Sequence, residues 1–265
     1  MRQLKRIPLI TFLIFLTCCE KDMNSFNFTE NINVGLMEIF DDNHQKVFTM
    51  RLVPSQNCHC MNKGEIIYSF IKLGNLFNIN LQEIQIPKGC NDGHGTPFAD
   101  IVLGSLSNGI YDIQVNTKSN YNKALLTVTD TAYRVTIKIQ ENVNLIWGHY
   151  RRVFDNTLWG AFCYNTDSEL KTGLSLIDSL TSLGAQPTTL EDGEYSFFSI
   201  ENGKAILPLS FIVPHLYPGK EIAFAFDYRF ADEKLTSLLT KYIYKSGDLY
   251  LIVRTGKGFS FYNWR

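Results

Sequence analysis

The sequence lacks an excess of charge of either sign. Its 265 residues include 25 lysines and arginines and 26 aspartates and glutamates, which gives a formal net charge of −1. A protein that binds nucleic acid or an anionic membrane surface needs a basic surface that displaces counterions. The charge balance therefore predicts no nucleic-acid partner. The chain is 45% hydrophobic, which is enough apolar material to bury a sizeable core.

The sequence signatures of catalysis are absent as well. There is no Gly-x-Ser-x-Gly elbow, no His-Glu-x-x-His pair, no P-loop and no Gly-x-Gly-x-x-Gly turn after a strand. We therefore expect a protein without enzymatic activity and without a cofactor. A hydrolase whose site forms only in three dimensions stays open as an alternative, because catalytic triads are recognised by geometry and not by chain order.

Apolar runs long enough to span a membrane are also missing. Residues 205–219, "AILPLSFIVPHLYPG", are interrupted by three prolines and cannot form a spanning helix. At the start of the chain, Arg2, Lys5 and Arg6 precede the apolar run 7–17, "IPLITFLIFLT". This run is shorter than the roughly 20 residues that a spanning helix needs, and a basic start followed by a short apolar run is typical of a secretory signal.

The leader ends in "LTCC", residues 16–19, and is followed by "EKD". This ending resembles the bacterial lipobox, in which Leu stands three residues before the cysteine that is lipidated. The resemblance implies a signal peptide over 1–18, a lipid on Cys19 and a polar tether over 19–30. A cut before Cys18 would put Phe15 where the lipobox prefers Leu. The charged start also resembles lipoproteins of the Bacteroidetes group, which implies an outer-membrane or surface location with the lipid as membrane anchor.

The first half of the chain has the pattern of β-strands. Residues 133–140 and 110–116 alternate apolar and polar side chains, which indicates strands with one buried face. Asn108-Gly109 is a hairpin signal and pairs the strand from Ile110 with residues 98–106. Short strands with turn signals every 8–12 residues predict an antiparallel β-sandwich over 31–142. It resembles the immunoglobulin-like modules of surface lipoproteins, although the Cys…Trp…Cys core of immunoglobulin domains is missing.

The second half, 143–265, is predicted to be an α+β domain with two helices. Leucines at helical spacing indicate a helix that starts near Asp167 as N-cap and ends before Gly184. A second helix is expected over 232–247, and a hairpin around Gly256-Lys257-Gly258 joins the last two strands. The junction near 142/143 has no Pro/Gly/Ser-rich linker, so we expect the two domains to pack together.

Cysteine and histidine residues gather in two polar loops of the first half. A disulfide from Cys90 to Cys58 or Cys60 is the favoured interpretation, because an exported protein meets oxidising conditions. The alternative is a zinc or copper site, although Cys-x-Cys is tighter than the usual spacing of zinc ligands. Its ligands would be Cys58, His59, Cys60, Cys90 and His94. Cys163 lies in the apolar stretch "WGAFCYN" and is expected to be a buried free thiol.

The end of the chain and two short patterns offer weaker candidate sites. In "GKGFSFYNWR", alternation assigns Phe259 and Phe261 to the core and leaves Tyr262 and Trp264 as a candidate ligand platform. The segment "WGHYRRVF", residues 147–154, mixes aromatic and cationic side chains, and we interpret it as a solvated strand face. Thr131, in Asp130-Thr131-Ala132, resembles the acceptor of protein O-glycosylation in Bacteroidetes.

Together these features predict a lipid-anchored cell-envelope lipoprotein with a non-enzymatic binding or assembly role. Its ligand would be a glycan or another envelope protein. A metal-binding surface protein and a secreted hydrolase are the two alternatives.

Overall fold

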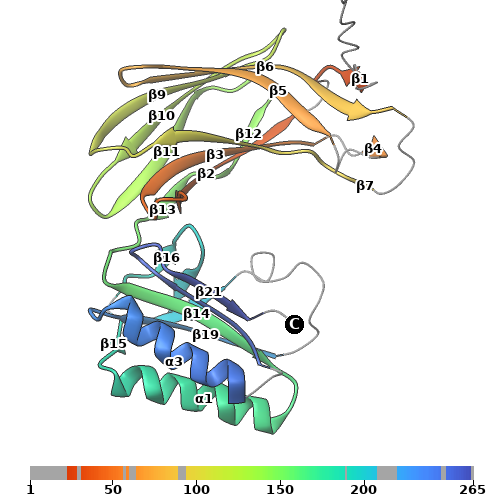
Figure 1. Ribbon diagram of the computed structural model, residues 1–265. Coiled ribbons are helices and arrows are strands. Elements are labelled where there is room, and N and C mark those ends of the chain that lie inside the picture. Colours follow the sequence, from red (N-terminus) through yellow and green to blue (C-terminus); the bar gives the residue numbers. More distant parts are fainter. Residues whose placement is uncertain are drawn as a thin grey trace, which may run out of the picture.

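The computed structural model describes residues 23–28, 31–55, 58–59, 64–88, 94–188, 190–207, 220–245 and 249–263. The described part of the chain is mainly β, with 57% strand and 13% helix, which confirms the predicted β-rich class. Figure 1 shows two parts along the chain: strands of residues up to about 150 above, and a second sheet with two helices below. Among the described residues, no helix is both long and apolar enough to cross a membrane.

The larger sheet of the N-terminal part has seven strands, in the order β1-β6-β9-β10-β11-β13, with β5 beside β6. Strands β9, β10 and β11 form an antiparallel meander, whereas β6 and β9 run parallel. The bounds of these strands are β1 Met23–Phe26, β5 Glu65–Leu73, β6 Leu76–Pro87, β9 Gly109–Asn116, β10 Tyr121–Val128, β11 Ala132–Ile139 and β13 His149–Arg151.

The smaller sheet has the order β12-β2-β3-β8, and β12 lies parallel to β2. Strands β4 and β7 form a separate two-residue ladder. The bounds are β2 Ile32–Phe40, β3 Lys46–Pro54, β8 Ala99–Gly104, β12 Val143–Trp147, β4 Cys58–His59 and β7 His94–Gly95.

The hairpin predicted at Asn108-Gly109 is wrong. Strand β8 pairs with β3 in the smaller sheet, while β9 pairs with β10 and β6 in the larger one. The turn therefore carries the chain from one sheet to the other. Strand β8 buries alternate side chains, Ala99, Ile101 and Leu103. The burial of this face in the core determines which strand β8 pairs with, and the turn sequence does not.

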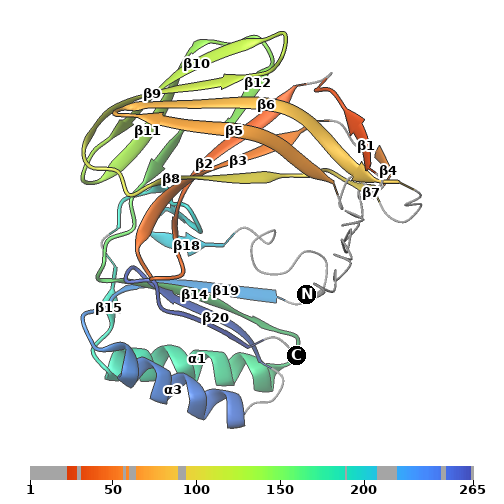
Figure 2. The ribbon, with the colours of Figure 1, turned by 45° about the horizontal axis from the view of Figure 1, so that its top comes forward.

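Figure 2 shows the two N-terminal sheets facing each other. The buried apolar side chains of both sheets form one hydrophobic core. Leu36 and Phe48 come from the smaller sheet, and Phe77, Ile79 and Tyr133 come from the larger one. The ring of Phe48 meets the ring of Tyr133 edge to face at 5.0 Å. Strands β12 and β13, which follow the boundary predicted at 142/143, pair with strands of this part.

The C-terminal part is built on a five-stranded sheet with the order β15-β19-β14-β20-β21. Along the chain, β14, α1, β15, β19, α3 and β20 give the order βαββαβ, with an insertion between β15 and β19. The order of these four strands in the sheet is that of the split βαβ unit. The bounds are β14 Thr157–Tyr164, α1 Asp167–Ser182, β15 Gln186–Pro187, β19 Lys220–Asp227, α3 Asp232–Lys245, β20 Tyr250–Thr255 and β21 Ser260–Asn263. The predicted last hairpin is confirmed by the β20–β21 ladder.

Helix α1 starts one residue earlier than the N-cap prediction. Thr166 is the N-cap: its side chain accepts from the backbone N–H of Glu169, and the Glu169 carboxylate accepts from the backbone N–H of Thr166. Asp167 is instead the first helical residue, where its negative charge is favoured by the helix dipole. Gly184 follows the helix with φ of 101°, a conformation that favours glycine.

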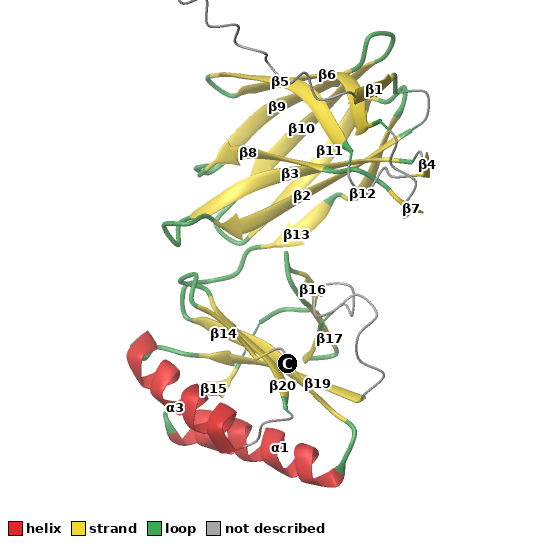
Figure 3. Cartoon of the chain, turned by 45° about the vertical axis from the view of Figure 1, so that its right-hand side comes forward, coloured by secondary structure: helices red, strands yellow, loops and turns green. Residues whose placement is uncertain are grey.

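The two faces of the C-terminal sheet are covered differently. Helices α1 and α3 pack on one face and bury Leu176, Leu180 and Leu239, and Figure 3 shows them on the side away from the N-terminal part. The other face carries Trp159 and meets Phe198 of an inserted three-stranded sheet. The strands of this insertion are β16 Gly193–Glu194, β17 Ser199–Glu201 and β18 Lys204–Ile206.

Candidate functional site

A buried polar network joins the two parts of the chain. The backbone N–H of Glu38 in β2 donates to the Ser196 hydroxyl at 2.9 Å, and Ser196 shares a hydrogen bond of 2.7 Å with the Tyr133 hydroxyl. The Glu38 carboxylate accepts from the Arg152 guanidinium at 2.6 Å. All four residues contribute to one network. The network therefore connects the N-terminal sheets to the inserted sheet and to the segment between them.

Next to this network lies a polar cleft of about 170 Å³. Its walls come from the β10–β11 turn, from the segment that connects β13 to β14, from the loop before β16 and from the end of β19. Clefts where two parts of a chain meet are preferred places for ligand sites. The side chains that line it include Thr131, Arg151, Phe154, Asn156, Glu191 and Asp227.

Each charged side chain that lines the cleft has a partner of opposite charge, either in the cleft or beside it. Arg151 forms an ion pair with Glu191 at 2.5 Å and donates to the backbone carbonyl of Asp192. Asp227 accepts from Asn156 at 2.8 Å and from Arg229 at 3.1 Å. The cleft therefore presents many hydrogen-bonding groups while carrying little net charge.

Two pKa shifts define the protonation states in the cleft. The Arg229 guanidinium hydrogen-bonded to Asp227 lowers the pKa of that carboxyl, so Asp227 is an acceptor at neutral pH. Burial raises the pKa of Tyr195 to about 12, so its phenol keeps the proton. That proton is donated to the backbone carbonyl of Glu191 at 3.0 Å.

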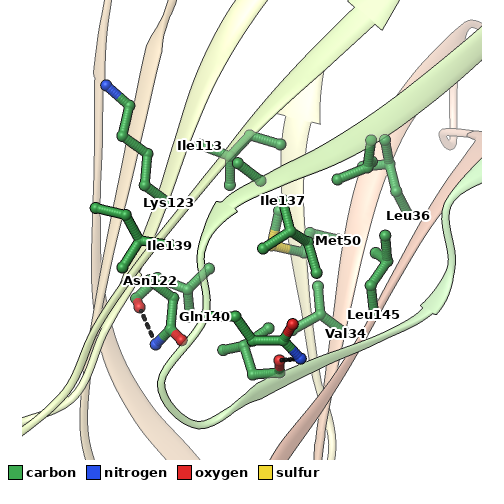
Figure 4. A pocket seen from close by; sticks show the side chains of 14 residues that line it. Val34, Leu36, Met50, Ile113, Asn122, Lys123, Ile137, Ile139, Gln140 and Leu145 are labelled. Carbon is green, nitrogen blue, oxygen red and sulfur yellow. Dashed lines mark hydrogen bonds between the residues drawn. The ribbon is translucent and has the colours of Figure 1, made fainter.

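A second, apolar crevice lies between the two N-terminal sheets, where β11 and β12 diverge (Figure 4). Val34, Met50, Ile137 and Leu145 line it, and Lys123 extends away from its centre. Its volume of about 30 Å³ leaves room for a water molecule or two, and it is far below the roughly 150 Å³ of a cavity that binds benzene. We interpret the crevice as a gap in packing, and the polar cleft remains the better candidate site.

The predicted cysteine and histidine cluster lies partly outside the described residues. Cys60 and Cys90 fall there, so the disulfide and metal interpretations stay predictions. The backbone ladder of β4 and β7 does pair His59 with His94 and Cys58 with Gly95, and it thus brings the two loops together. Within the part of the chain that the structure describes, no three potential metal ligands gather, and no disulfide is found.

Other predicted residues are placed as follows. Cys163 is a buried free thiol, as expected. Tyr262 is exposed and accepts from Arg254 at 2.6 Å, whereas Cys19 and Trp264 lie outside the described residues. Thr131 is exposed in the β10–β11 turn and lines the polar cleft. Its glycosylation stays a prediction.

The interpretation of residues 147–154 as a solvated strand face is wrong for its two arginines. Arg151 and Arg152 are partly buried, and each forms an ion pair with a residue distant in the sequence. The error arises because alternation along a strand reports burial within one sheet only, whereas Arg151 contacts Glu191 of the second part of the chain and Arg152 contacts Glu38 of the other N-terminal sheet.

Sequence reasoning missed the remaining cleft residues. Asn156 lies in a turn after Asp155, and Asp227 ends a strand with alternating apolar residues. Each is an ordinary polar residue at the end of an element, and 71 positions separate them in the chain. No pattern in the sequence links two such residues before the fold brings them together.

Comparison with known proteins identifies no relative: no family model, no curated protein and no solved structure matches this chain.

Proposed function

We propose that this protein is a lipid-anchored cell-envelope protein that binds a ligand without converting it, and that the ligand occupies the polar cleft between its two parts. The observation that carries this proposal is the pairing of every charged group that we describe in the cleft, Arg151 with Glu191, Arg152 with Glu38 and Asp227 with Arg229. The Arg152–Glu38 pair, whose side chains are 21% and 5% exposed, holds Arg152 in place before a ligand arrives, which lowers the entropic cost of binding.

The same pairing favours binding over hydrolysis. A glycosidase needs one carboxylic acid whose pKa is raised so that it can protonate the leaving group. Glu191 and Asp227 both line the cleft, and each contacts a guanidinium group. The Arg229 guanidinium lowers the pKa of Asp227, which is the reverse of what a proton donor needs. We therefore infer a binding role, and hydrolysis of an oligosaccharide by the purified protein would contradict it.

The proposed lipid anchor depends on the leader alone. Mass spectrometry of the N-terminal peptide is expected to find a diacylglycerol on Cys19. An unmodified mature terminus at another residue would contradict the anchor. An outer-membrane or surface location is part of the same proposal, and protease treatment of intact cells distinguishes a surface-facing protein from one that faces the periplasm.

Another envelope protein is the second candidate ligand, and a specific observation favours it. Exposed apolar side chains gather on β5 and β8, which are edge strands of the two N-terminal sheets and contact each other. They are Tyr68, Ile71, Leu73 and Val102. Exposed apolar patches mark protein contacts, and free edge strands offer unpaired backbone groups. Crosslinking in intact cells, followed by identification of the captured protein, tests this candidate, and an Ile71→Lys substitution is expected to abolish the crosslink.

The metal-binding alternative and the immunoglobulin-like relationship stay proposals. Non-reducing peptide mapping tests the link from Cys90 to Cys58 or Cys60, and stoichiometric metal with free thiols would favour the metal site. The two facing sheets support a sandwich, whereas the parallel pairs β6–β9 and β12–β2 depart from an all-antiparallel arrangement.

A further inference from the structure

The charge distribution of the cleft restricts the chemistry of its ligand. Each guanidinium that lines the cleft already contacts a carboxylate: Arg151 meets Glu191 at 2.5 Å, and Arg152 meets Glu38 at 2.6 Å. An anionic ligand would have to compete for these cations and would also approach Asp227 and Glu191. A cationic ligand would have to compete with Arg229 for the Asp227 carboxylate. A ligand without net charge displaces neither kind of partner and brings no unpaired charge into the cleft.

The polar groups of the cleft suit neighbouring hydroxyl groups. The Asp227 carboxylate has about four lone-pair positions, and Asn156 and Arg229 use only part of them. Asn156 donates one N–H to Asp227, and its amide carbonyl oxygen accepts no hydrogen bond among the described residues. A carboxylate and an amide fixed side by side thus offer an acceptor and a mixed donor–acceptor group, which matches two vicinal hydroxyls.

Phe154 supplies an apolar surface at the same site. The residue is 43% exposed although it lines the cleft. The backbone of this residue is held firmly: its carbonyl accepts from the N–H of Thr157 at 3.0 Å, and Gly256 packs directly against it. An exposed aromatic ring beside a polar cleft can stack on the C–H face of a ring-shaped ligand. The volume of about 170 Å³ is below the 300–1,000 Å³ of drug-sized sites, so it admits one such ring.

We propose that the cleft binds one uncharged sugar ring, with its hydroxyls on Asp227 and Asn156 and its C–H face on Phe154. This inference rests on the proposed binding function and names the ligand class for its site. A sugar ring combines vicinal hydroxyls, an apolar face and no charge, and the described side chains of the cleft offer a partner for each of these features.

The test uses the full-length protein in detergent micelles. Isothermal titration and saturation-transfer NMR compare methyl glycosides of glucose, galactose, mannose and N-acetylglucosamine with glucuronic acid and glucose 6-phosphate. We expect at least one neutral glycoside to bind saturably and at least about tenfold more tightly than either anion. The reason is that the anion brings a charge into the cleft that no free cation compensates, and even a small free-energy cost of this kind lowers the affinity tenfold.

Matched variants locate the binding. Phe154→Ala is expected to weaken it by roughly two- to tenfold, the range of one aromatic contact. Phe98→Ala is the control, because Phe98 is also exposed, at 58%, but does not line the cleft. Asn156→Ala removes one hydroxyl partner without adding charge. Thermal unfolding of each variant separates lost binding from lost folding, and Phe154→Leu keeps the apolar bulk without the ring face.

The inference is overturned if no neutral glycoside binds, if an anion binds better, or if Phe98→Ala and Phe154→Ala weaken binding equally. The broader proposal is tested separately. If no neutral glycoside binds but crosslinking in cells captures an envelope protein, the binding role stands and only the sugar ligand is refuted. If hydrolysis products appear in the NMR spectra, the non-enzymatic role is refuted.

Discussion

The ion pair between Glu38 and Arg152 offers the sharpest test of how the two parts are held together. The Glu38 side chain is 5% exposed and that of Arg152 is 21% exposed. The guanidinium donates to the same carboxylate oxygen through Nε at 3.1 Å and a terminal nitrogen at 2.6 Å. Arg152→Met keeps most of the apolar stem and removes this partner, so a buried carboxylate is left without its cation.

The expected loss of stability is about 3 kcal/mol. Removing one partner of a buried pair costs about 3–5 kcal/mol, and we take the lower end because Arg152 is partly exposed. A typical domain is stable by only about 5–15 kcal/mol, so the change is readily measured. The Glu38→Gln, Arg152→Met double variant removes both charges. It should recover part of the loss, because no unpaired charge stays buried.

The assay is urea unfolding followed by circular dichroism, with all variants compared at the same pH and salt. The transition midpoint should fall in Arg152→Met while the dependence on urea stays constant, since the surface exposed on unfolding is unchanged. Arg229→Met is the matched control. That side chain is 76% exposed and pairs with Asp227, so its loss should leave the transition midpoint almost unchanged.

A loss below about 1 kcal/mol for Arg152→Met would refute the reasoning, because the pair would then behave like an exposed one. A double variant less stable than either single variant would refute it as well, since that would show the charges to be independent. Either result would mean that the cleft beside Arg152 is not held by this network.

Three further predictions concern other parts of the chain. Burial raises the pKa of the Glu221 carboxyl in the folded protein. Its contribution to stability is therefore present below the pKa of the unfolded chain and is lost as the pH rises through the folded pKa. Glu221→Gln should raise the melting temperature at pH 7 and leave it unchanged near pH 4. A methyl group on Gly173 of α1 would clash with the Phe162 ring, so Gly173→Ala should destabilise by about 1–3 kcal/mol in a urea titration. A net gain in stability from the better helix propensity of alanine would contradict this packing. Val135→Ile places one methyl group in the apolar crevice of about 30 Å³ and should stabilise by up to about 0.7 kcal/mol; a loss would show that the crevice is already filled.

Most local elements were determined by the sequence. Alternation predicted β9 and β11, helical spacing predicted α1 and α3, and Gly256-Lys257-Gly258 predicted the last hairpin. These succeed because periodicity and turn chemistry are properties of neighbouring residues. The leader also predicts a lipid anchor from a local pattern, although Cys19 lies outside the described residues.

Strand partners and the candidate site were decided only by the tertiary structure. Alternation in β8 shows that one face is buried, but it does not say which sheet covers that face, and the strand joined β3 instead of β9. Glu38 and Arg152 are 114 residues apart, and Asn156 and Asp227 are 71 apart. Such pairs leave no periodic trace, because their contact depends on how two separately patterned parts pack and not on the spacing within either one.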